Sequence, residues 1–429
     1  MPNTFCDPSI DSLIEAELPA LVDCYKMLHA MPELSGQEEK TSAYLARELR
    51  SLGFTVTEGV GKYLHQTWRG FGIVAVLQNG PGPTVLLRAD MDALPVEEKT
   101  CLPYASKVKA TFKDAQEVGV MHACGHDVHV TSLIGTARML ARLRGTWQGT
   151  VVAIGQPGEE GGGGALAMLN DGAYRHCPKP DYALALHATL HLEAGQVGYR
   201  PGNFMASFSE VDVTVRGVGA HGSAPECGKD PIVMAAQLIL ALQTVVSREK
   251  NPLEPAVLTV GSIHGGTASN IIPDEVQLQL SIRTYDDKVR DQIVASIERI
   301  ARGVALAAGV PEDRAPVVKL KASHPANYND PELTERVAGA LKRALGEGNV
   351  MRVYPVMASE DFGFWSLKRE IPTCMFWLGA ADPVLFKQSR ESGVPLPSHH
   401  SPLFAPLPEP TIRAGVRATT AAVLDLLGK

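Results

Sequence analysis

The feature that most constrains the fold of this chain is a change in hydrophobic periodicity partway along the sequence. In the first third, and again near the C-terminus, segments with helical spacing of apolar residues alternate with short, nearly continuous apolar runs. Such runs are typical of central strands in a sheet that helices cover on both faces, and the alternation predicts an α/β fold. We expect helices at residues 13–29, 38–52, 130–143, 331–345 and 409–427 and strands at 72–77, 84–88, 150–154 and 182–186.

Residues 196–322 follow a different pattern. From Val211 to Val215, apolar residues alternate with polar ones, as in a half-exposed strand with a period of two. A helix, two strands, a second helix and a last strand follow at residues 232–246, 257–263, 276–282, 289–304 and 317–320. This β-α-β-β-α-β order is the ferredoxin-like arrangement. We therefore predict an α/β domain with a central mixed sheet, formed by residues 1–195 and 323–429, and a ferredoxin-like domain inserted between its two parts.

The composition excludes several classes of function. The net charge of −7 comes from interspersed acidic and basic residues, without the basic run that a nucleic-acid-binding surface needs. No apolar run approaches the length required to span a bilayer, and residues 1–11 lack the charged and apolar regions of a secretory signal. The seven scattered cysteines fit reduced thiols better than a disulfide framework. We expect a cytoplasmic protein with no nucleic-acid or membrane partner.

Residues 122–129, His-Ala-Cys-Gly-His-Asp-Val-His, hold one thiol and three imidazoles. Cysteine and neutral histidine are ligands that zinc, manganese and similar divalent ions prefer. Gly125 separates Cys124 from His126 and lets the backbone bend between them. An apolar helical pattern follows, so the cluster lies where a loop enters a helix. A solvated, histidine-rich helix start is the simpler interpretation of one such residue, but it does not account for this density.

Two pairs of carboxylates follow predicted strands. Asp90 and Asp92 come directly after one strand, and Glu159 and Glu160 come after another. Adjacent carboxylates on an extended chain point in different directions, so one can bind a metal while its neighbour faces the reacting water. A solvated turn and ordinary surface charge are the alternatives for each pair taken alone.

Two further histidine positions complete the pattern. His187 follows the predicted strand 182–186, and His399 and His400 lie in a proline-rich loop. Each of these alone is more often structural than functional. Together with the cysteine and the carboxylates, they supply the ligands and a spare base for a hydrolytic metal site with open coordination positions.

These motifs resemble one known family, the amidohydrolase branch of the metal-dependent carboxypeptidases and aminoacylases. That branch includes hippurate hydrolases, N-acyl-amino-acid amidohydrolases and plant auxin-conjugate hydrolases. The resemblance covers nearly the whole chain. It rests on residues 88–95 (Arg-Ala-Asp-Met-Asp-Ala-Leu-Pro), 122–129, 156–160 and 400–402 and, in the inserted domain and after it, on residues 217–225, 230–232, 265–270 and 359–362.

The resemblance implies a site for two divalent metal ions, zinc or manganese. Glu159 would be the general base and Asp92 an orienting carboxylate. His400, which directly precedes Ser-Pro, fits the family position better than His399. The implied ligands are Cys124 as a bridging thiolate, His126, Glu160, His187 and His400.

The resemblance also implies that the inserted domain is a lid and a dimerisation domain. His221 would stabilise the oxyanion, and Asn270 would face the substrate, either in the same subunit or across the interface of a homodimer or a higher homo-oligomer. A substrate that ends in a carboxylate needs a cationic or amide partner when it is buried. Arg283, on the polar face of its strand, is a second candidate for that partner, and a surface salt bridge is the alternative role for it.

The chain departs from the family pattern at four positions. Asp90 stands where other branches have a metal-binding histidine, and Cys124 where they have a bridging aspartate. Glu226 stands where relatives often have histidine, and Ala185 replaces a frequent glycine. These departures leave the implied reaction unchanged but leave the substrate preference open.

The sequence therefore predicts a metal-dependent amidohydrolase that acts on an N-acyl amino acid or a similar C-terminal amide. A dipeptidase or aminopeptidase of the same architecture is one alternative. A catalytically silent metal-binding or sensor protein is another, but a structural site needs no spare base such as Glu159. A cysteine protease that uses Cys124 is the third, and its activity would survive chelation.

Overall fold

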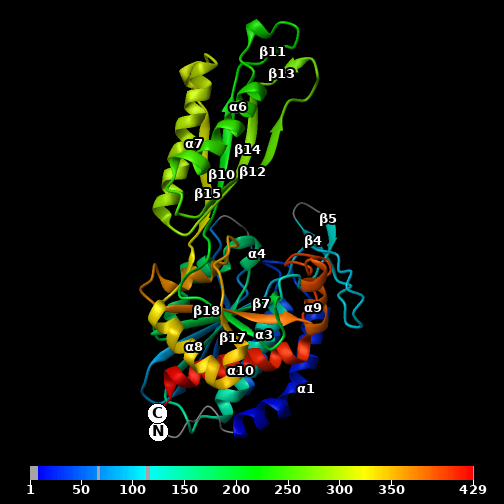
Figure 1. Cartoon of the computed structure of the whole chain (residues 1–429), viewed down its shortest axis with the longest axis vertical. Coiled ribbons are helices and arrows are strands. Elements are labelled where there is room, and N and C mark those ends of the chain that lie inside the picture. Colours follow the sequence, from blue (N-terminus) through cyan, green and yellow to red (C-terminus); the bar gives the residue numbers. More distant parts are fainter. Residues whose placement is uncertain (1–7, 65–67, 113–115, 429) are drawn as a thin grey trace. The chain divides into compact units, whose positions relative to one another are not determined.

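The structure is a computed structural model that describes residues 8–64, 68–112 and 116–428 (Figure 1). The chain divides into two compact units. The larger unit comprises Met1–Gly202, Tyr328–Tyr354 and Asp361–Lys429, and the smaller comprises Asn203–Asn327 and Pro355–Glu360. The return segment 355–360 has no counterpart among the predicted boundaries, which were placed at residues 196 and 322.

An eight-stranded mixed sheet forms the centre of the larger unit. In spatial order its strands are β1 (Thr55–Val60), β2 (Gly72–Asn79), β6 (Gly149–Gln156), β3 (Thr84–Asp90), β7 (Tyr182–Glu193), β18 (Thr373–Ala381), β8 (Val197–Tyr199) and β17 (Val350–Arg352). β3 runs parallel to β6 and β7, and β18 runs parallel to β7, whereas β2 is antiparallel to β1 and β6. Every residue of β3 and β6 is buried, as expected for apolar central strands. The predicted α/β fold with a central mixed sheet is confirmed.

Helices flank this sheet. The long ones are α1 (Pro8–Ala30), α2 (Glu39–Ser51), α3 (His126–Arg142), α8 (Pro331–Leu345) and α10 (Pro408–Leu427). α10 packs against α1, α3 and α8, and α3 also contacts β3 and β7 (Figure 1). The short elements of this unit are β4 (Lys109–Phe112), β5 (Gln116–Gly119), α4 (Glu159–Gly162), α5 (Gly164–Asn170), the 3₁₀ helix η7 (Asp361–Ser366) and α9 (Pro383–Ser392). α5 and η7 pack against each other, and each also contacts strands of the sheet.

The smaller unit has the ferredoxin-like order that its sequence pattern predicts. Its elements are β10 (Phe208–Arg216), α6 (Pro231–Thr244), β12 (Ala256–Gly265), β14 (Glu275–Thr284), α7 (Asp287–Ala307) and β15 (Val317–His324). The strands form an antiparallel sheet with the spatial order β12-β14-β10-β15. Val211, Val213 and Val215 of β10 are buried against α6 and α7. A small two-stranded antiparallel sheet, β11 (Ala220–His221) with β13 (Ile271–Ile272), also belongs to this unit.

One helix of the smaller unit corrects an expectation about membranes. Residues 231–249, which comprise α6 and the turn after it, form the one helix in the described parts of the chain that is long and apolar enough to cross a bilayer, with a mean hydropathy of 1.4. The expectation that no apolar run approaches that length was therefore wrong. The helix is apolar because one face, which includes Leu238 and Leu242, packs in the core of its unit, while Val233 and Leu240 on its surface are also apolar.

Candidate metal centre

The predicted carboxylates lie beyond the ends of two parallel strands. β3 ends at Asp90 and β6 at Gln156, and these residues are partners in the register, so the following loops leave the sheet at one edge. Asp92 lies in the first loop. Glu159 and Glu160 open the helix α4 in the second loop, not an extended segment as expected. Successive side chains on a helix diverge by about 100°, so the two carboxylates can still serve different roles.

The Cys-Gly-His segment is shaped by its glycine. α3 begins at His126, four residues before the predicted helix start, so both His126 and His129 belong to the helix. Gly125 has a φ of +84°, in the left-handed region that favours glycine, and a Cβ there would lie 3.0 Å from the Cβ of Ala188. This turn places Cys124 and His126 on either side of a tightly packed corner.

His187 does not lie beyond the end of a strand, as the sequence suggested. β7 continues to Glu193 because β18 pairs with it in parallel as far as that residue. His187 is therefore held inside the sheet opposite Trp377, with ring centroids 5.3 Å apart. A histidine inside a buried strand has a fixed backbone, which orients its ring more strongly than a loop would.

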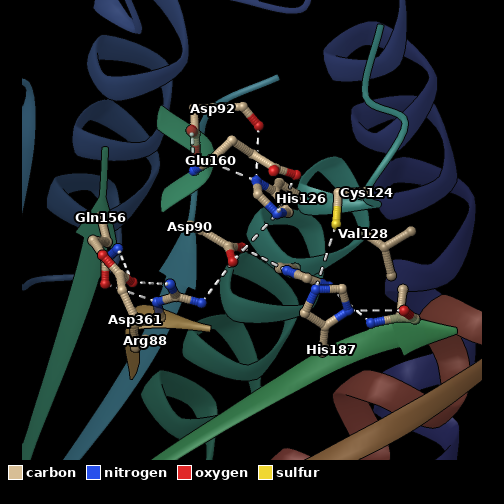
Figure 2. A network of polar contacts seen from close by, with 12 residues as sticks. Arg88, Asp90, Asp92, Cys124, His126, Val128, Gln156, Glu160, His187 and Asp361 are labelled. Carbon is tan, nitrogen blue, oxygen red and sulfur yellow. Dashed lines mark hydrogen bonds and ion pairs between the residues drawn. The ribbon is translucent and has the colours of Figure 1, made fainter. Parts of the chain in front are cut away.

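The structure brings the predicted metal-binding residues together (Figure 2). They form three groups, and within each group the candidate ligand atoms lie within 4.8 Å of one another. The groups are Cys124 with His126 and His187, Cys124 with Glu160 and His400, and His126 with Glu159 and Glu160. Cys124 belongs to two of them, which is the position that a bridging ligand would occupy. Within these groups, Cys124 Sγ lies 3.6 Å from His187 Nε2, and His400 Nε2 lies 3.1 Å from Glu160 Oε1.

Backbone carbonyls fix the tautomers of two of these histidines. His126 Nδ1 donates to the carbonyl of Asp92 at 2.8 Å, and His187 Nδ1 donates to the carbonyl of Ala188 at 2.8 Å. Each neutral ring therefore keeps the lone pair on Nε2, and a backbone contact of this kind is how metal-binding imidazoles are usually oriented. His126 Nε2 is buried, and it has no hydrogen-bond partner among the described residues. A cation would satisfy it.

The third histidine of the motif is committed elsewhere. His129 Nδ1 donates to Asp90 Oδ1 at 2.5 Å, and Nε2 accepts from the N–H of Ala188 at 2.8 Å. Both ring nitrogens are therefore in use. The other oxygen of Asp90 accepts from Arg88 Nη1 at 2.6 Å (Figure 2). His129 and Asp90 thus help to hold the cluster in place. They also lie close enough to His126 to form a further group of candidate metal ligands.

Arg88 is the centre of a second buried network. Its Nε donates to Gln156 Oε1 at 2.9 Å and its Nη2 to Asp361 Oδ1 at 3.0 Å. Burial alone would raise the pKa of Asp90, but the Arg88 guanidinium and the neighbouring imidazoles hold it well below its usual range. Arg88 therefore neutralises Asp90 and joins the ends of β3 and β6 to η7.

The charges of the cluster suit divalent cations. Burial and the carboxylates of Glu160 and Glu159 raise the pKa of the Cys124 thiol well above its usual value. Burial lowers the pKa of His126, but the Asp90 and Asp92 carboxylates outweigh burial and raise it to about 10. Nearby carboxylates contribute to both shifts, although burial is the larger cause for Cys124. Bound cations would offset the charge of these carboxylates and allow the thiolate and the neutral imidazole that metal binding requires.

The two C-terminal histidines point to different partners. The N–H of His400 donates to the Ala123 carbonyl at 2.9 Å, and its φ of +67° is in the left-handed region, which non-glycine residues rarely adopt. This conformation directs its ring toward Glu160. His399 Nε2 instead donates to the Ala188 carbonyl at 2.8 Å, and burial lowers its pKa to about 4. The geometry therefore favours His400 over His399 as a ligand.

His221 and Asn270 lie side by side in the smaller unit. His221 of β11 pairs with Ile271 of β13, and the N–H of Gly222 donates to the Asn270 carbonyl at 2.8 Å. Both side chains are exposed. Ser223 donates to His221 Nδ1 from its backbone N–H at 3.1 Å and from its hydroxyl at 2.8 Å. These two contacts leave the proton of the neutral ring on Nε2, where it can be donated to another group.

Arg283 lies far from the small sheet formed by β11 and β13. It occupies the far end of β14 from Glu275, and eight residues of strand correspond to about 26 Å. Its Nη1 donates to the Ser359 hydroxyl at 3.0 Å, and its guanidinium lies 4.9 Å from the centroid of the Phe208 ring. One unit therefore cannot place Arg283 and Asn270 on the same small carboxylate.

Several residues that support the cluster were given no role from the sequence. They are Ser35, Glu38, Arg88, His129, Gln156 and Asp361. A charged residue inside an otherwise apolar strand was a visible signal for Arg88. The loop that holds Ser35 and Glu38 lies more than 100 residues before Glu160 and carries no local signal for its role.

The chain is similar to known hydrolases over most of its length. The model of a family described as peptidase family M20/M25/M40 matches residues 86–391. The chain is 37% identical over 350 residues to N-acetyl-L-cysteine deacetylase of Bacillus subtilis (strain 168), an alignment that covers 80% of this chain and 77% of that protein. It is 38% identical over 340 residues to hippurate hydrolase of Campylobacter jejuni subsp. jejuni serotype O:2, which covers 79% and 82% of the two chains.

A solved structure extends this similarity to three dimensions. The Bacillus subtilis YXEP protein, a dinuclear metal-binding peptidase from the M20 family, matches with a TM-score of 0.73 and 28% identity. The match covers 96% of this chain and 99% of that one. The similarity thus includes both the mixed sheet and the ferredoxin-like unit.

Proposed function

This chain belongs to peptidase family M20/M25/M40, and we propose that within that family it hydrolyses the amide bond of N-acyl amino acids. It is a metal-dependent amidohydrolase, and its relatives include an N-acetyl-L-cysteine deacetylase and a hippurate hydrolase. The observation that carries the proposal is the shared position of Cys124 in two ligand groups, with Glu159 directly beside the ligand candidate Glu160. A binding site alone would not need that additional carboxylate.

We infer that the site would hold two divalent ions, zinc or manganese, and that Cys124 would be a ligand shared by both. His126, Glu160, His187 and His400 would complete the ligand sets. When bound, such ions polarise a carbonyl group and lower the pKa of water.

Glu159 is the proposed general base. Its carboxylate takes a proton from the attacking water and delivers it to the amide nitrogen, so that the products are the free carboxylic acid and the amino acid. Asp92 accepts from the N–H of Glu160 through Oδ2 at 2.9 Å, and its own carbonyl orients His126. Asp92 therefore holds a ligand candidate from each of two loops.

The smaller unit is proposed as a lid and a dimerisation domain. His221 would donate from Nε2 to the developing oxyanion, and Asn270 would contact the substrate. In a homodimer, His221 and Asn270 would act at the partner subunit's site. Arg283 stays a candidate partner for the substrate carboxylate.

The cellular location remains a proposal. Cys24, Cys101, Cys124, Cys177, Cys227 and Cys374 are the cysteines among the described residues, and all six are unpaired. Free thiols of this number are typical of a reducing compartment, so we propose the cytoplasm.

A substrate panel tests the proposed function. Protein loaded with zinc or with manganese is assayed against N-acetyl, N-benzoyl and indole-acyl amino acids and against simple dipeptides. We expect hydrolysis of N-acyl amino acids that chelation abolishes and added metal restores. Hydrolysis of free-amino dipeptides alone would establish the dipeptidase alternative. Activity that survives chelation and is lost on thiol alkylation would establish the cysteine protease alternative.

A further inference from the structure

A buried carboxyl group outside the cluster contacts the segment that carries the proposed base. Glu38 lies directly before α2 and is fully buried. We propose that Glu38 is a positioning residue that holds the turn Gly158–Glu160 in its active geometry. This inference rests on the proposed function, because it assumes that Glu159 is the base.

The contacts of Glu38 link two loops. Its Oε1 accepts from the N–H of Gly158 at 2.8 Å and from the N–H of Gly36 at 2.9 Å. Its Oε2 is buried without a hydrogen-bond partner among the residues that the structure describes. The polar contacts of this side chain therefore go to the backbone of its own loop and to the residue before Glu159.

A second carboxylate holds the other side of the same turn. Asp92 Oδ2 accepts from the N–H of Glu160 at 2.9 Å and from the Ser35 hydroxyl at 2.6 Å. The backbone N–H groups on either side of Glu159 are thus both held by buried carboxyl groups. Ser35 and Glu38 both belong to the loop before α2, so this one loop sets the position of the turn from both sides.

Tight packing leaves the turn little room to move. Gly158 has a φ of +62°, and a Cβ there would lie 2.7 Å from the Tyr63 hydroxyl. A Cβ on Gly161 would lie 3.2 Å from the Ser35 hydroxyl. Because the surroundings already fit the turn closely, losing one hydrogen bond would displace Glu159 by a small distance, and small displacements of reacting groups reduce rates strongly.

The charge state of Glu38 suggests a conservative variant for testing this role. Burial and the neighbouring Asp92 carboxylate raise the pKa of Glu38 to about 8. Near pH 7 its side chain is therefore mostly a neutral acid, and glutamine matches it in shape and charge. Gln at position 38 keeps a carbonyl oxygen that can accept from both N–H groups, whereas Ala keeps none.

Glu33 offers a matched control. Its carboxylate also accepts backbone N–H groups at the start of α2, from Lys40 at 3.0 Å and from Thr41 at 2.8 Å. The hydrogen bonds that the structure gives for the Glu33 carboxylate go to Lys40 and Thr41, and not to the turn that carries Glu159. Glu33→Ala therefore weakens the same helix start without releasing the turn.

The experiment compares Glu38→Ala, Glu38→Gln, Glu33→Ala and Glu159→Gln as metal-loaded proteins on N-benzoylglycine and N-acetyl-L-cysteine, with metal content and Tm measured on each. We expect Glu38→Ala to lower kcat by roughly 10- to 100-fold at full metal occupancy, with KM nearly unchanged. Glu38→Gln should restore most of kcat, and Glu33→Ala should lower Tm but not kcat. If Glu38→Ala does not fold, Glu38→Asp withdraws the acceptor by one methylene and should lower kcat in the same way.

Three outcomes would overturn the inference. They are a wild-type kcat for fully loaded Glu38→Ala, an equal loss of kcat in Glu33→Ala, and a Glu38→Gln protein as slow as Glu38→Ala. Glu159→Gln separates this inference from the proposed function. If Glu159→Gln is inactive while Glu38→Ala is normal, only the positioning role fails, whereas a normal Glu159→Gln removes the proposed base itself.

Discussion

The polar residues around Cys124 and those around His221 are held in opposite ways. In the first region the side chains are mostly buried, come from distant segments, and have their ring nitrogens assigned by neighbouring groups. In the second region His221 and Asn270 are exposed at the small sheet of β11 and β13, and the ring of His221 contacts the nearby Ser223. The difference indicates that folding alone assembles the first region, whereas the second region presents its side chains to solvent.

The largest effect is expected from the buried region. Cys124→Ala should lower metal content and abolish turnover, because it removes the proposed shared ligand. Cys124→Ser should be nearly as poor, since a hydroxyl is a much weaker anionic ligand than a thiolate. Metal analysis and steady-state assays check both variants. Full metal occupancy with normal rates in either one would remove the central role given to Cys124.

The next effect separates a base from a ligand within one turn. Glu159→Gln should retain metal and lose kcat by roughly 10²- to 10⁴-fold, the range for loss of a general base. Glu160→Gln, its matched control, should weaken metal binding instead. If both variants lost metal equally, the two adjacent residues would share one role and the assignment would fail.

The exposed region is tested by His221→Ala. If its Nε2 proton stabilises the oxyanion, kcat should fall by roughly 10²- to 10³-fold with metal content unchanged. Mixing inactive Glu159→Gln subunits with inactive His221→Ala subunits tests whether the contact crosses a dimer. Recovered activity supports the contact across the dimer, and no recovery despite proven subunit exchange would place His221 at its own subunit's site or outside any site.

Asn270→Ala tests which group of the substrate Asn270 recognises. If Asn270 binds the carboxylate of the substrate, kcat/KM for N-acyl amino acids should fall by roughly 10- to 100-fold, as for a hydrogen bond to a charged group. An analogue that carries an amide in place of that carboxylate should lose much less. Equal losses on both substrates would show that Asn270 contacts the scissile carbonyl or the backbone of the proposed lid.

The smallest effect concerns the stability of the buried region. His29 donates to Asp127 at 2.7 Å and to Glu98 at 3.1 Å. Burial lowers its pKa, but these carboxylates outweigh burial and raise it to about 9. A pKa raised by folding stabilises the protein fully below the unfolded value of about 6.5, and that stabilisation is lost as the pH rises through 9.

The difference in free energy of unfolding between wild type and His29→Ala should therefore shrink between pH 6.5 and 9.5, by an amount on the order of 2 kcal/mol. Denaturant titrations at fixed metal concentration measure it, and the metal contribution cancels where both proteins bind equally. A difference that is constant over this range would show that His29 is neutral in the folded protein.

The sequence was a good guide where the signal was local. Runs of apolar residues predicted β3 and β6, and the period-two pattern predicted β10 and its ferredoxin-like neighbours. The Cys-Gly-His motif and the adjacent glutamates could be identified because each lies within a few residues of a strand or helix end. Whether these residues bind metal stays a prediction, but their convergence is a structural fact.

The sequence was a poor guide where tertiary contacts decide. Nothing in the local sequence distinguishes His129 from His126. Both ring nitrogens of His129 make hydrogen bonds, whereas Nε2 of His126 makes none with the described residues. β7 extends past His187 because β18 pairs with it, and β18 is almost 200 residues away in the sequence. Glu38 is important to the turn only because the fold brings Gly158 to it.

The peptide groups of Ala188 have a consequence for inheritance. The carbonyl of Ala188 accepts from His187 and His399, and its N–H donates to His129. The hydrogen bonds by which Ala188 orients three imidazoles therefore come from its main chain, and its methyl side chain supplies none of them. A mutational scan at this position would record only a limit on size, set by the packing of the Ala188 side chain against Gly125, and a strong penalty for proline. Natural selection can therefore preserve the orientation of these rings without favouring one residue type at position 188.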